Sequence, residues 1–409
     1  MGWLADETGL EKCAAHHVPL TPLSFLARAA RVFPDHAAVV YGSHRRSYAE
    51  HQARVSRLAS ALARAGIAPG DVVATLLPNI PAQVEAHFGV PACGAVLNTI
   101  NIRLDADTLA HILDHGGAKL VLCDPQILPR LAEALEIMTG PPPRVIEVAD
   151  PVAGIAAYGD YMDYEEFLAS GDPAFDWILP QDEWESLALN YTSGTTGRPK
   201  GVVYHHRGAY LNAMGQVLSW RMVLHPVYLT IVPLFHCNGW CHTWMMPAIG
   251  GTLVCCRDIT ARAIYAAIAD EGVTHFGGAP IVLNMLVNAP EQEKRGFDHA
   301  VEVFTAGAPP APATLAKIET MGFHVTQVYG LTEGSGVATH LMPEEHRTAV
   351  ADGHPERLVS AGRAVPEVEG RIVDPATLED LPTGEHGEIW LRTPQLFKGY
   401  LNRPEATAE

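Results

Sequence analysis

Residues 187–205 read LALNYTSGTTGRPKGVVYH. The runs at 187–192 and 201–205 each predict a short strand. Between them, small and hydroxyl-bearing residues leave successive backbone N–H groups open, which is a pattern that binds anions, and Lys200 adds a positive charge. The stretch is not a P-loop, because a strand follows it and the next helix is predicted only at about 207–219. The residues therefore indicate either a phosphate-binding loop or a plain flexible hairpin loop.

YTSGTTGRPKGV resembles the signature of the adenylate-forming enzymes, a family that includes acyl-CoA synthetases, luciferases and the adenylation domains of peptide synthetases. The resemblance implies a loop that grips the β- and γ-phosphates of ATP. It assigns Lys200 to the leaving group and Thr195 to catalysis and Mg²⁺. The full set of expected phosphate-binding residues is Thr192, Ser193, Gly194, Thr195, Thr196, Gly197 and Lys200.

Two apolar runs in the second half, VEVFTAG (301–307) and HVTQVYG (324–330), are joined by a segment of helical length. Such a unit places its two strands parallel, and ligands of doubly wound sheets bind beyond the carboxyl ends of the strands. The glycines at these ends let a flat ring approach the backbone, unless they are ordinary strand-end turns.

QVYGLTE resembles the second hallmark of the same family, which supports the adenine ring. The resemblance implies that Thr332 contacts the α-phosphate and that Glu333 holds Mg²⁺, a cation suited to carboxylate and phosphate oxygens. Gly307-Ala308-Pro309 resembles the segment that walls the adenine and acyl pockets. The residues expected at the nucleotide in this region are Gly307, Ala308, Pro309, Gln327, Val328, Tyr329, Gly330, Leu331 and Thr332.

PLFHCNGWCHTW (233–244) follows another predicted parallel strand and therefore faces the same crevice. Its Cys and His spacing matches no usual structural zinc pattern. The resemblance places His236, counted as catalytic, beside the substrate carboxylate, and Trp240 in the acyl tunnel, where it favours a short or medium chain unless it is plain core. HCNGWC together with GGAP (277–280) is most similar to the medium-chain and 3-methylmercaptopropionate CoA ligases. The expected acyl pocket is His236, Trp240, Gly277, Gly278, Gly307 and Gly330.

Strands alternating with helices predict an α/β protein with two doubly wound, mostly parallel sheet subdomains. We expect the first at 1–186, the second, with the ATP loop, at 187–360, and the start of a smaller antiparallel β subdomain at 361–409. The acidic, aromatic span 160–185 is expected to be surface connection. The resemblance runs from about residue 20 to 409, whereas family members continue into a small C-terminal domain with an essential Lys. We therefore expect this chain to be the large N-terminal domain alone, severely impaired in full turnover.

The composition narrows the possible partners and the location. With 28 Lys and Arg against 46 Asp and Glu, the net charge is −18, and no basic run suggests a nucleic-acid partner. Seven irregularly spaced cysteines are typical of reduced thiols in a cytosolic protein. No apolar run approaches the roughly 18 residues of a membrane span. We expect a cytoplasmic protein with no integral membrane segment, and a homodimer as one possible assembly.

The implied reaction is attack of a carboxylate on the α-phosphorus of ATP, followed by displacement of AMP by the thiol of coenzyme A. The expected partners are a small carboxylic acid, ATP, Mg²⁺ and coenzyme A. Two alternatives stay open at this point. One is adenylation of an amino or aryl acid for a carrier protein, or luciferase-like oxygenation. The other is a nucleotide-binding module without catalysis.

Overall fold

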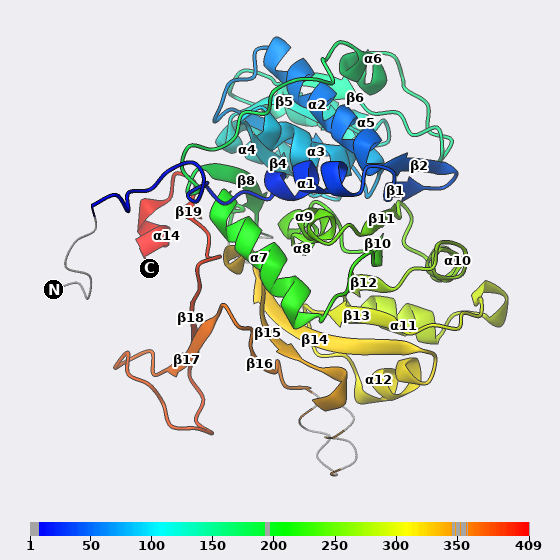
Figure 1. Ribbon diagram of the computed structural model, residues 1–409, viewed down its shortest axis with the longest axis vertical. Coiled ribbons are helices and arrows are strands. Elements are labelled where there is room, and N and C mark those ends of the chain that lie inside the picture. The colour runs from blue at the N-terminus through cyan, green and yellow to red at the C-terminus, as the bar shows by residue number, and fades with distance from the viewer. Residues whose placement is uncertain are drawn as a thin grey trace.

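The computed structural model of the protein describes residues 8–192, 197–345, 348, 352, 357 and 359–408. Within these ranges, two large sheets enclose a shared layer of helices, and a two-stranded antiparallel sheet lies to one side (Figure 1). The predicted α/β class, with two doubly wound, mostly parallel sheets and a smaller antiparallel unit, is confirmed. No helix in the described ranges is both long enough and apolar enough to cross a bilayer.

The first sheet has eight strands and is parallel through its centre. Its antiparallel edge consists of the two strands that flank the hydroxyl-rich loop and a short strand from the end of the chain. In spatial order, the strands are β19 (Gly399–Tyr400), β9 (Gly201–His205), β8 (Ser186–Tyr191), β4 (Val96–Thr99), β3 (Val72–Leu76), β5 (Ala118–Cys123), β6 (Arg144–Glu147) and β7 (Met162–Asp163).

The second sheet has nine strands, and its five central pairings are parallel, as predicted for 301–307 and 324–330. In spatial order, the strands are β16 (Arg363–Ala364), β15 (Gly336–Leu341), β14 (Phe323–Leu331), β13 (Val301–Thr305), β12 (His275–Gly278), β10 (Val227–Thr230), β11 (Thr252–Cys255), β1 (Ala37–Tyr41) and β2 (His44–Ser47). The separate hairpin is β17 (Glu369–Val373) with β18 (Glu388–Arg392).

The helices divide into an inner and two outer layers because strand side chains alternate between the faces of a sheet. On β3, Val73 packs into the core between the sheets, whereas Ala74 packs against the outer helices of the first sheet. The inner helices include α1 (Leu23–Val32), α2 (Tyr48–Arg64), α3 (Pro81–Ala92), α7 (His206–Ser219) and α9 (His242–Ala248). The outer helices are α4 (Ala106–Gly116) and α5 (Leu128–Ile137) on the first sheet, and α10 (Ala261–Glu271), α11 (Pro280–Val287) and α12 (Pro312–Glu319) on the second.

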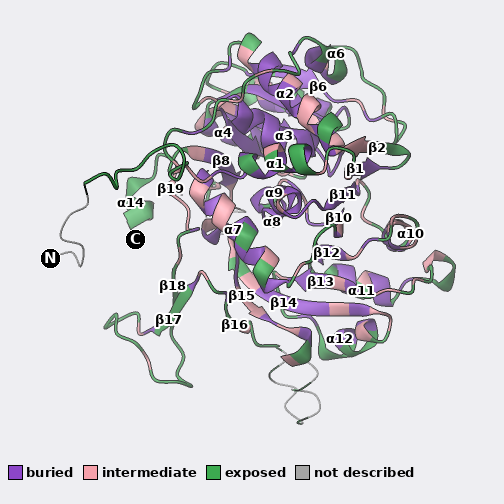
Figure 2. Ribbon diagram, viewed as in Figure 1, coloured by how far each residue is buried: buried purple, intermediate pink, exposed green. Residues whose placement is uncertain are grey.

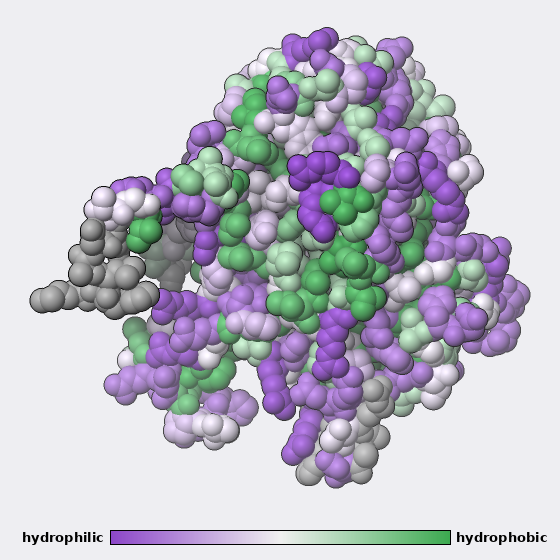
Figure 3. Space-filling model, in the orientation of Figure 1, coloured by the Kyte–Doolittle hydropathy of each residue, from purple (hydrophilic) through white to green (hydrophobic). Residues whose placement is uncertain are grey.

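Burial follows this layering. Figure 2 shows α3 and α9 largely buried and the β17–β18 hairpin largely exposed. Figure 3 shows apolar side chains gathered on one face, where the end of α7 and the segment after it expose Leu218, Val223 and Leu224. The homodimer stays a prediction.

The sheets do not follow the linear division expected at 186/187 and 360/361. Strands β8 and β9, placed in the second unit from the sequence, belong to the first sheet, and β1 and β2 belong to the second. Near the end of the chain, β16 joins the second sheet, whereas β19 returns to the first. The reason is pairing: β8 lies parallel to β4 and antiparallel to β9, so the loop between β8 and β9 is carried by the first sheet.

The span 160–185 contains more structure than the expected surface connection. Helix α6 (Tyr164–Ala169) begins there, and Asp163 caps it by accepting from the N–H groups of Glu165 and Glu166. Tyr164 and Phe167 are buried against the first sheet. In the sequence, the aromatic residues within this acidic stretch could have indicated a buried helix.

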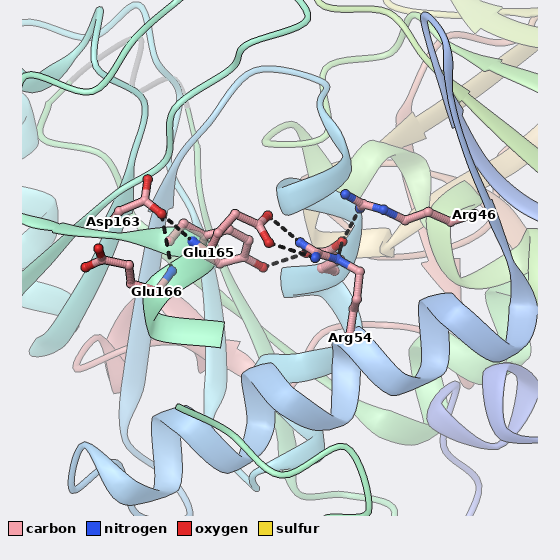
Figure 4. Close-up of polar contacts among 7 residues, drawn as sticks. Arg46, Arg54, Asp163, Glu165 and Glu166 are labelled. Atoms are coloured by element: carbon pink, nitrogen blue, oxygen red, sulfur yellow. Dashed lines mark hydrogen bonds and ion pairs between the residues drawn. The ribbon is translucent and has the colours of Figure 1, made fainter. Parts of the chain in front are cut away.

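A buried carboxylate ties α6 to the inner helices (Figure 4). Glu85 on α3 is fully buried and accepts hydrogen bonds from Arg46, from Arg54 (Nε to Oε1, 2.6 Å) and from the hydroxyl of Tyr164 (2.7 Å). Arg54 also pairs with Glu165 at the surface, 2.6 Å away. Burial alone would raise the pKa of Glu85, but Arg54 and Arg46 outweigh it and hold the pKa below its usual value. Glu85 is therefore ionised and fully partnered.

We expect Glu85→Gln to lower the free energy of unfolding by about 3–5 kcal/mol, because it leaves two arginines around an uncharged buried group. The matched control is Glu165→Gln, which removes a largely exposed partner of the same Arg54 and should cost less than about 1 kcal/mol. Urea denaturation followed by circular dichroism measures both. Equal losses in the two variants would contradict this account of the cluster.

Candidate active site

A cavity of about 830 Å³ opens where strand ends of both sheets meet. It is lined by Thr99 at the end of β4, Tyr191 at the end of β8, Gly278 at the end of β12, Gly307 just after β13 and Leu331 at the end of β14. These are carboxyl ends of parallel strands, the place where doubly wound sheets bind ligands. The two sheets thus contribute opposite walls to one cavity.

Ten of the residues expected at the site from sequence line this cavity. They come from separate segments between Thr192 and Glu333, which the fold brings together. They are Thr192, His236, Trp240, Gly278, Gly307, Val328, Gly330, Leu331, Thr332 and Glu333.

Other expected residues lie near the cavity without lining it, or cannot be placed. Ser193, Gly194, Thr195 and Thr196 lie outside the described residues. Gln327 is buried, and its Oε1 has no hydrogen-bond partner among the described residues. The remaining expected residues that are not in the lining are Gly197, Lys200, Gly277, Ala308, Pro309, Gln327 and Tyr329.

Gly277 does not line the cavity, but its lack of a side chain makes room for Trp240, which does. A Cβ on Gly277 would lie 2.8 Å from Cγ2 of Val232 and 3.2 Å from the ring of Trp240. The missing side chain is therefore what lets the Trp240 ring lie against the strand. Position 330 requires glycine for a different reason: a Cβ there would lie 1.9 Å from the carbonyl oxygen of Gly336 on the paired strand.

Glu333 is held by a residue that sequence reasoning did not single out. The hydroxyl of Tyr400 on β19 donates to Oε1 of Glu333 at 2.6 Å, and Nζ of Lys200 lies 4.2 Å from the centre of the Tyr400 ring. Burial, followed by the nearby Glu333 carboxylate, raises the pKa of the Tyr400 hydroxyl. Tyr400 thus links the carboxylate in the cavity to the lysine of the loop. In the sequence around Tyr400, only the short GY run at 399–400 could have indicated a strand here.

The turn that carries Cys237 and Trp240 has an unusual backbone. Residues 237–241 all have positive φ, with values from 47° at Cys237 to 63° at Cys241. Left-handed conformation costs roughly 1–2 kcal/mol per non-glycine residue and normally occurs in single residues. Gly239 is the only residue of the five that adopts it freely. Such strain gathers at functional sites, where the surroundings hold it in place.

The surroundings of the turn are polar and buried. Gln216 on α7 donates through Nε2 to the carbonyl oxygen of Trp240 at 2.7 Å. Its Oε1 lies 2.6 Å from Nε2 of His242, whose Nδ1 lies 2.6 Å from the hydroxyl of Tyr228. Since an amide oxygen only accepts, His242 donates from Nε2 and accepts at Nδ1. Burial lowers the pKa of His242 to about 3, so the ring is neutral and keeps this tautomer.

A second set of contacts holds the other side of the turn. Asn190 on β8 donates to Oδ1 of Asn238 at 2.8 Å, and Sγ of Cys241 lies 3.3 Å from the carbonyl oxygen of Ser335. These contacts join the turn to the first sheet and to the end of β14. The position of Trp240 in the cavity is therefore set by both sheets.

His236 and Cys237 form a coupled pair at the cavity wall. Nε2 of His236 lies 4.0 Å from Sγ of Cys237, and the same sulfur lies 3.3 Å from Oγ1 of Thr332. The contact with Cys237 raises the pKa of His236. Burial acts to raise the pKa of Cys237, but His236 lowers it below its usual value. Both directions favour a partly ionised pair.

Part of the lining was not singled out from sequence. Asn101 and Arg103, just after β4, line the cavity on the side of the first sheet. Ile231, Val282 and Met285 supply an apolar wall on the side of the second sheet. Their positions in the sequence could have indicated them. Each follows a strand, and the ends of other strands in the same sheet were already expected at the site. The cavity therefore has a polar part near Glu333 and an apolar part near Trp240.

Comparison with known proteins agrees with this geometry. Residues 26–401 match the family model described as AMP-binding enzyme. The chain is 40% identical over 426 residues to a peroxisomal acetate/butyrate–CoA ligase of Arabidopsis thaliana, covering 99% of this chain and 74% of that protein. It is 41% identical over 420 residues to an acetate–CoA ligase of Humulus lupulus, again covering 99% and 74%.

The similarity to solved structures also covers nearly the whole chain. The inhibitor-bound N-terminal domain of FACL13 from Mycobacterium tuberculosis superposes with a TM-score of 0.82 at 29% identity, covering 95% of this chain and 93% of that one. With a match over most of its length, the chain belongs to the AMP-binding enzyme family. The family resemblance expected from the two hallmark segments is confirmed.

We expect Gln216→Met to lower the free energy of unfolding by about 1–3 kcal/mol, because it leaves the Trp240 carbonyl and the His242 N–H buried without partners. Gln126→Met is the control, since Gln126 is exposed and accepts only from Arg257 among the contacts of its side chain in the described residues. Urea denaturation measures the difference between the two variants. A loss at position 216 no larger than that at 126 would show that the polar chain does not support the turn.

Proposed function

We propose that the protein is an AMP-forming acyl-CoA synthetase that activates a short- or medium-chain carboxylic acid with ATP. The first step forms an acyl-adenylate and releases pyrophosphate. The second step transfers the acyl group to the thiol of coenzyme A and releases AMP. The observation that carries the proposal is the single cavity that joins Thr192, Thr332 and Glu333 to the apolar wall beside Trp240.

The adenylation step needs two anions to meet, so the residues must orient them and offset charge. We assign His236 to the substrate carboxylate and the hydroxyl of Thr332 to the α-phosphate. We assign Lys200 and the loop after Thr192, including Thr195, to the departing pyrophosphate. The carboxylate is already ionised at neutral pH, and no general base is needed for its attack. In the second step, the thiol sulfur bonds to the acyl carbon, and the bond from that carbon to the AMP oxygen breaks.

The residues present fit a magnesium ion. Glu333 presents a carboxylate to the cavity, and Mg²⁺ is bound by one or two carboxylates together with substrate phosphate oxygens. When bound, the ion would neutralise phosphate charge. Thr195 is the second ligand we assign. Tyr400 holds one oxygen of Glu333 and so orients the carboxylate.

The substrate class follows from the apolar half of the cavity. Trp240 lines the cavity, and we assign it to the end of the acyl part, where its indole would favour short chains, in keeping with the acetate and butyrate named for the Arabidopsis relative. An amino-acid substrate is the second candidate, but it calls for an acid near its amine. Among the described lining residues, Glu333 is the only acid, and it lies on the phosphate side.

The location of the protein and its catalytic turnover stay predictions. A cytoplasmic location is our expectation, although the Arabidopsis ligase is described as peroxisomal. The chain spans about three quarters of the length of that relative. The proposed activity is therefore tested by ligand binding as well as by turnover.

The direct test compares nucleotide binding with and without magnesium. We expect Glu333→Gln to weaken MgATP binding at least tenfold, about 1.4 kcal/mol, and to change binding of metal-free AMP less than threefold. Isothermal titration calorimetry gives both dissociation constants. A non-hydrolysable butyryl-adenylate mimic should bind more tightly than AMP. Wild-type protein that binds neither the mimic nor AMP would overturn the proposed function, and acid-dependent pyrophosphate release would extend it to turnover.

We expect Trp240→Ala to shift chain-length preference, because removing the indole deepens the apolar end of the cavity. The ratio of affinities for eight-carbon and four-carbon acyl-adenylate mimics should rise at least tenfold. Trp390→Ala on the exposed β17–β18 hairpin is the control and should leave the ratio unchanged. An unchanged ratio at position 240 would place Trp240 in the core rather than at the substrate.

A further inference from the structure

Cys237 is a thiol in the cavity wall that neither step of the proposed reaction uses. Its side chain lines the cavity although only 5% of the residue is exposed. Three side chains from separate elements surround the sulfur: His236 from the preceding turn, Thr332 from the end of β14 and Tyr204 from β9. The thiol thus has a base and two hydroxyl groups around it, in a residue that lines the cavity.

The other cysteines differ from Cys237 in a way that makes them internal references. Cys13 is exposed, and the remaining five are buried and do not line the cavity. Burial raises the pKa of each buried thiol, to about 12 for Cys93 and Cys256. It does the same for Cys123, Cys241 and Cys255. Since the thiolate is the nucleophile, these five should be inert.

The electrophile that fits is defined by what faces the sulfur. His236 beside Cys237 supplies a positive group when protonated, so an anionic reagent is not repelled from this thiolate as it is from an isolated one. The apolar wall opposite accepts a short carbon chain. The turn at 237–241 holds the sulfur in place with a strained backbone, which limits its retreat from the cavity.

We propose that Cys237 is a covalent-modification site inside the cavity, and that it takes small carbon electrophiles bearing a carboxylate, such as 2-haloacids. The preference for a carboxylate rests on the proposed function, which places the acid substrate at His236. In the reaction, the sulfur forms a bond to the α-carbon, the carbon–halogen bond breaks and halide leaves. The thiol proton passes to Nε2 of His236 and then to water. The product is a thioether that occupies the space beside Thr332.

The test uses the full chain, iodoacetate and iodoacetamide, with the alkylation rate of each cysteine read by peptide mass spectrometry. We expect Cys237 and Cys13 to react, and the buried five to react at least one hundredfold more slowly. The ratio of the iodoacetate rate to the iodoacetamide rate should be at least tenfold higher at Cys237 than at Cys13. Cys237→Ser should abolish cavity labelling while leaving the rate at Cys13 unchanged.

A second variant separates the role of the histidine from simple access. His236→Gln should lower the iodoacetate rate at Cys237 at least tenfold and leave both rates at Cys13 unchanged. Circular dichroism of each variant checks that the fold is kept.

Labelling of Cys237 as slow as that of Cys255 would overturn the inference. So would equal reagent ratios at Cys237 and Cys13. Neither result bears on the proposed function, which is tested separately by calorimetry with MgATP, AMP and the adenylate mimic. Failure of this inference and failure of the proposed function are therefore distinguishable.

Discussion

The structure depends on one constraint: two parallel sheets must bury their inner faces against the same layer of helices. Because α3 and α9 are covered from both sides, the sheets cannot shift independently without exposing that core. Their strand ends are therefore held against each other, and the cavity is the space that remains between them. The ionised Glu85 on α3, satisfied by two arginines, fixes the same layer through polar contacts.

The strained turn at 237–241 shows how this rigid frame is used. A run of left-handed residues is unfavourable by itself, and here the contacts come from β8, from α7 and from the end of β14. Each of these elements belongs to, or packs on, a sheet that the shared core already fixes. Trp240 and Cys237 are consequently presented from a backbone that has little freedom to relax. The acyl part of the site is defined by the sheets more than by the turn itself.

Sequence reasoning recovered what is local and missed what depends on pairing across the chain. The strands around the hydroxyl-rich loop and the parallel pair ending in Gly307 and Gly330 follow from apolar runs and glycine positions, and both were found. The QVYGLTE segment predicted Glu333, which lines the cavity, whereas its partner Tyr400 was not predicted. Tyr400 reaches the site only because β19 pairs with β9, which no local pattern indicates. For the same reason, the strands of each sheet do not follow the predicted boundaries at 186/187 and 360/361.

The interleaving of the two sheets has a consequence for how the chain acquires its structure. The first sheet takes strands from residue 72 onward but is completed only when Gly399 and Tyr400 add to β9, and the second begins with Ala37 yet waits for residues beyond 300. During synthesis, the second sheet cannot be completed before β16 (Arg363–Ala364) has left the ribosome, and the first cannot be completed before β19 (Gly399–Tyr400) has done so. Long-range pairing of this kind is slow and exposes unpaired strand edges. The nascent chain therefore exposes unpaired edges of both sheets until these late strands are added.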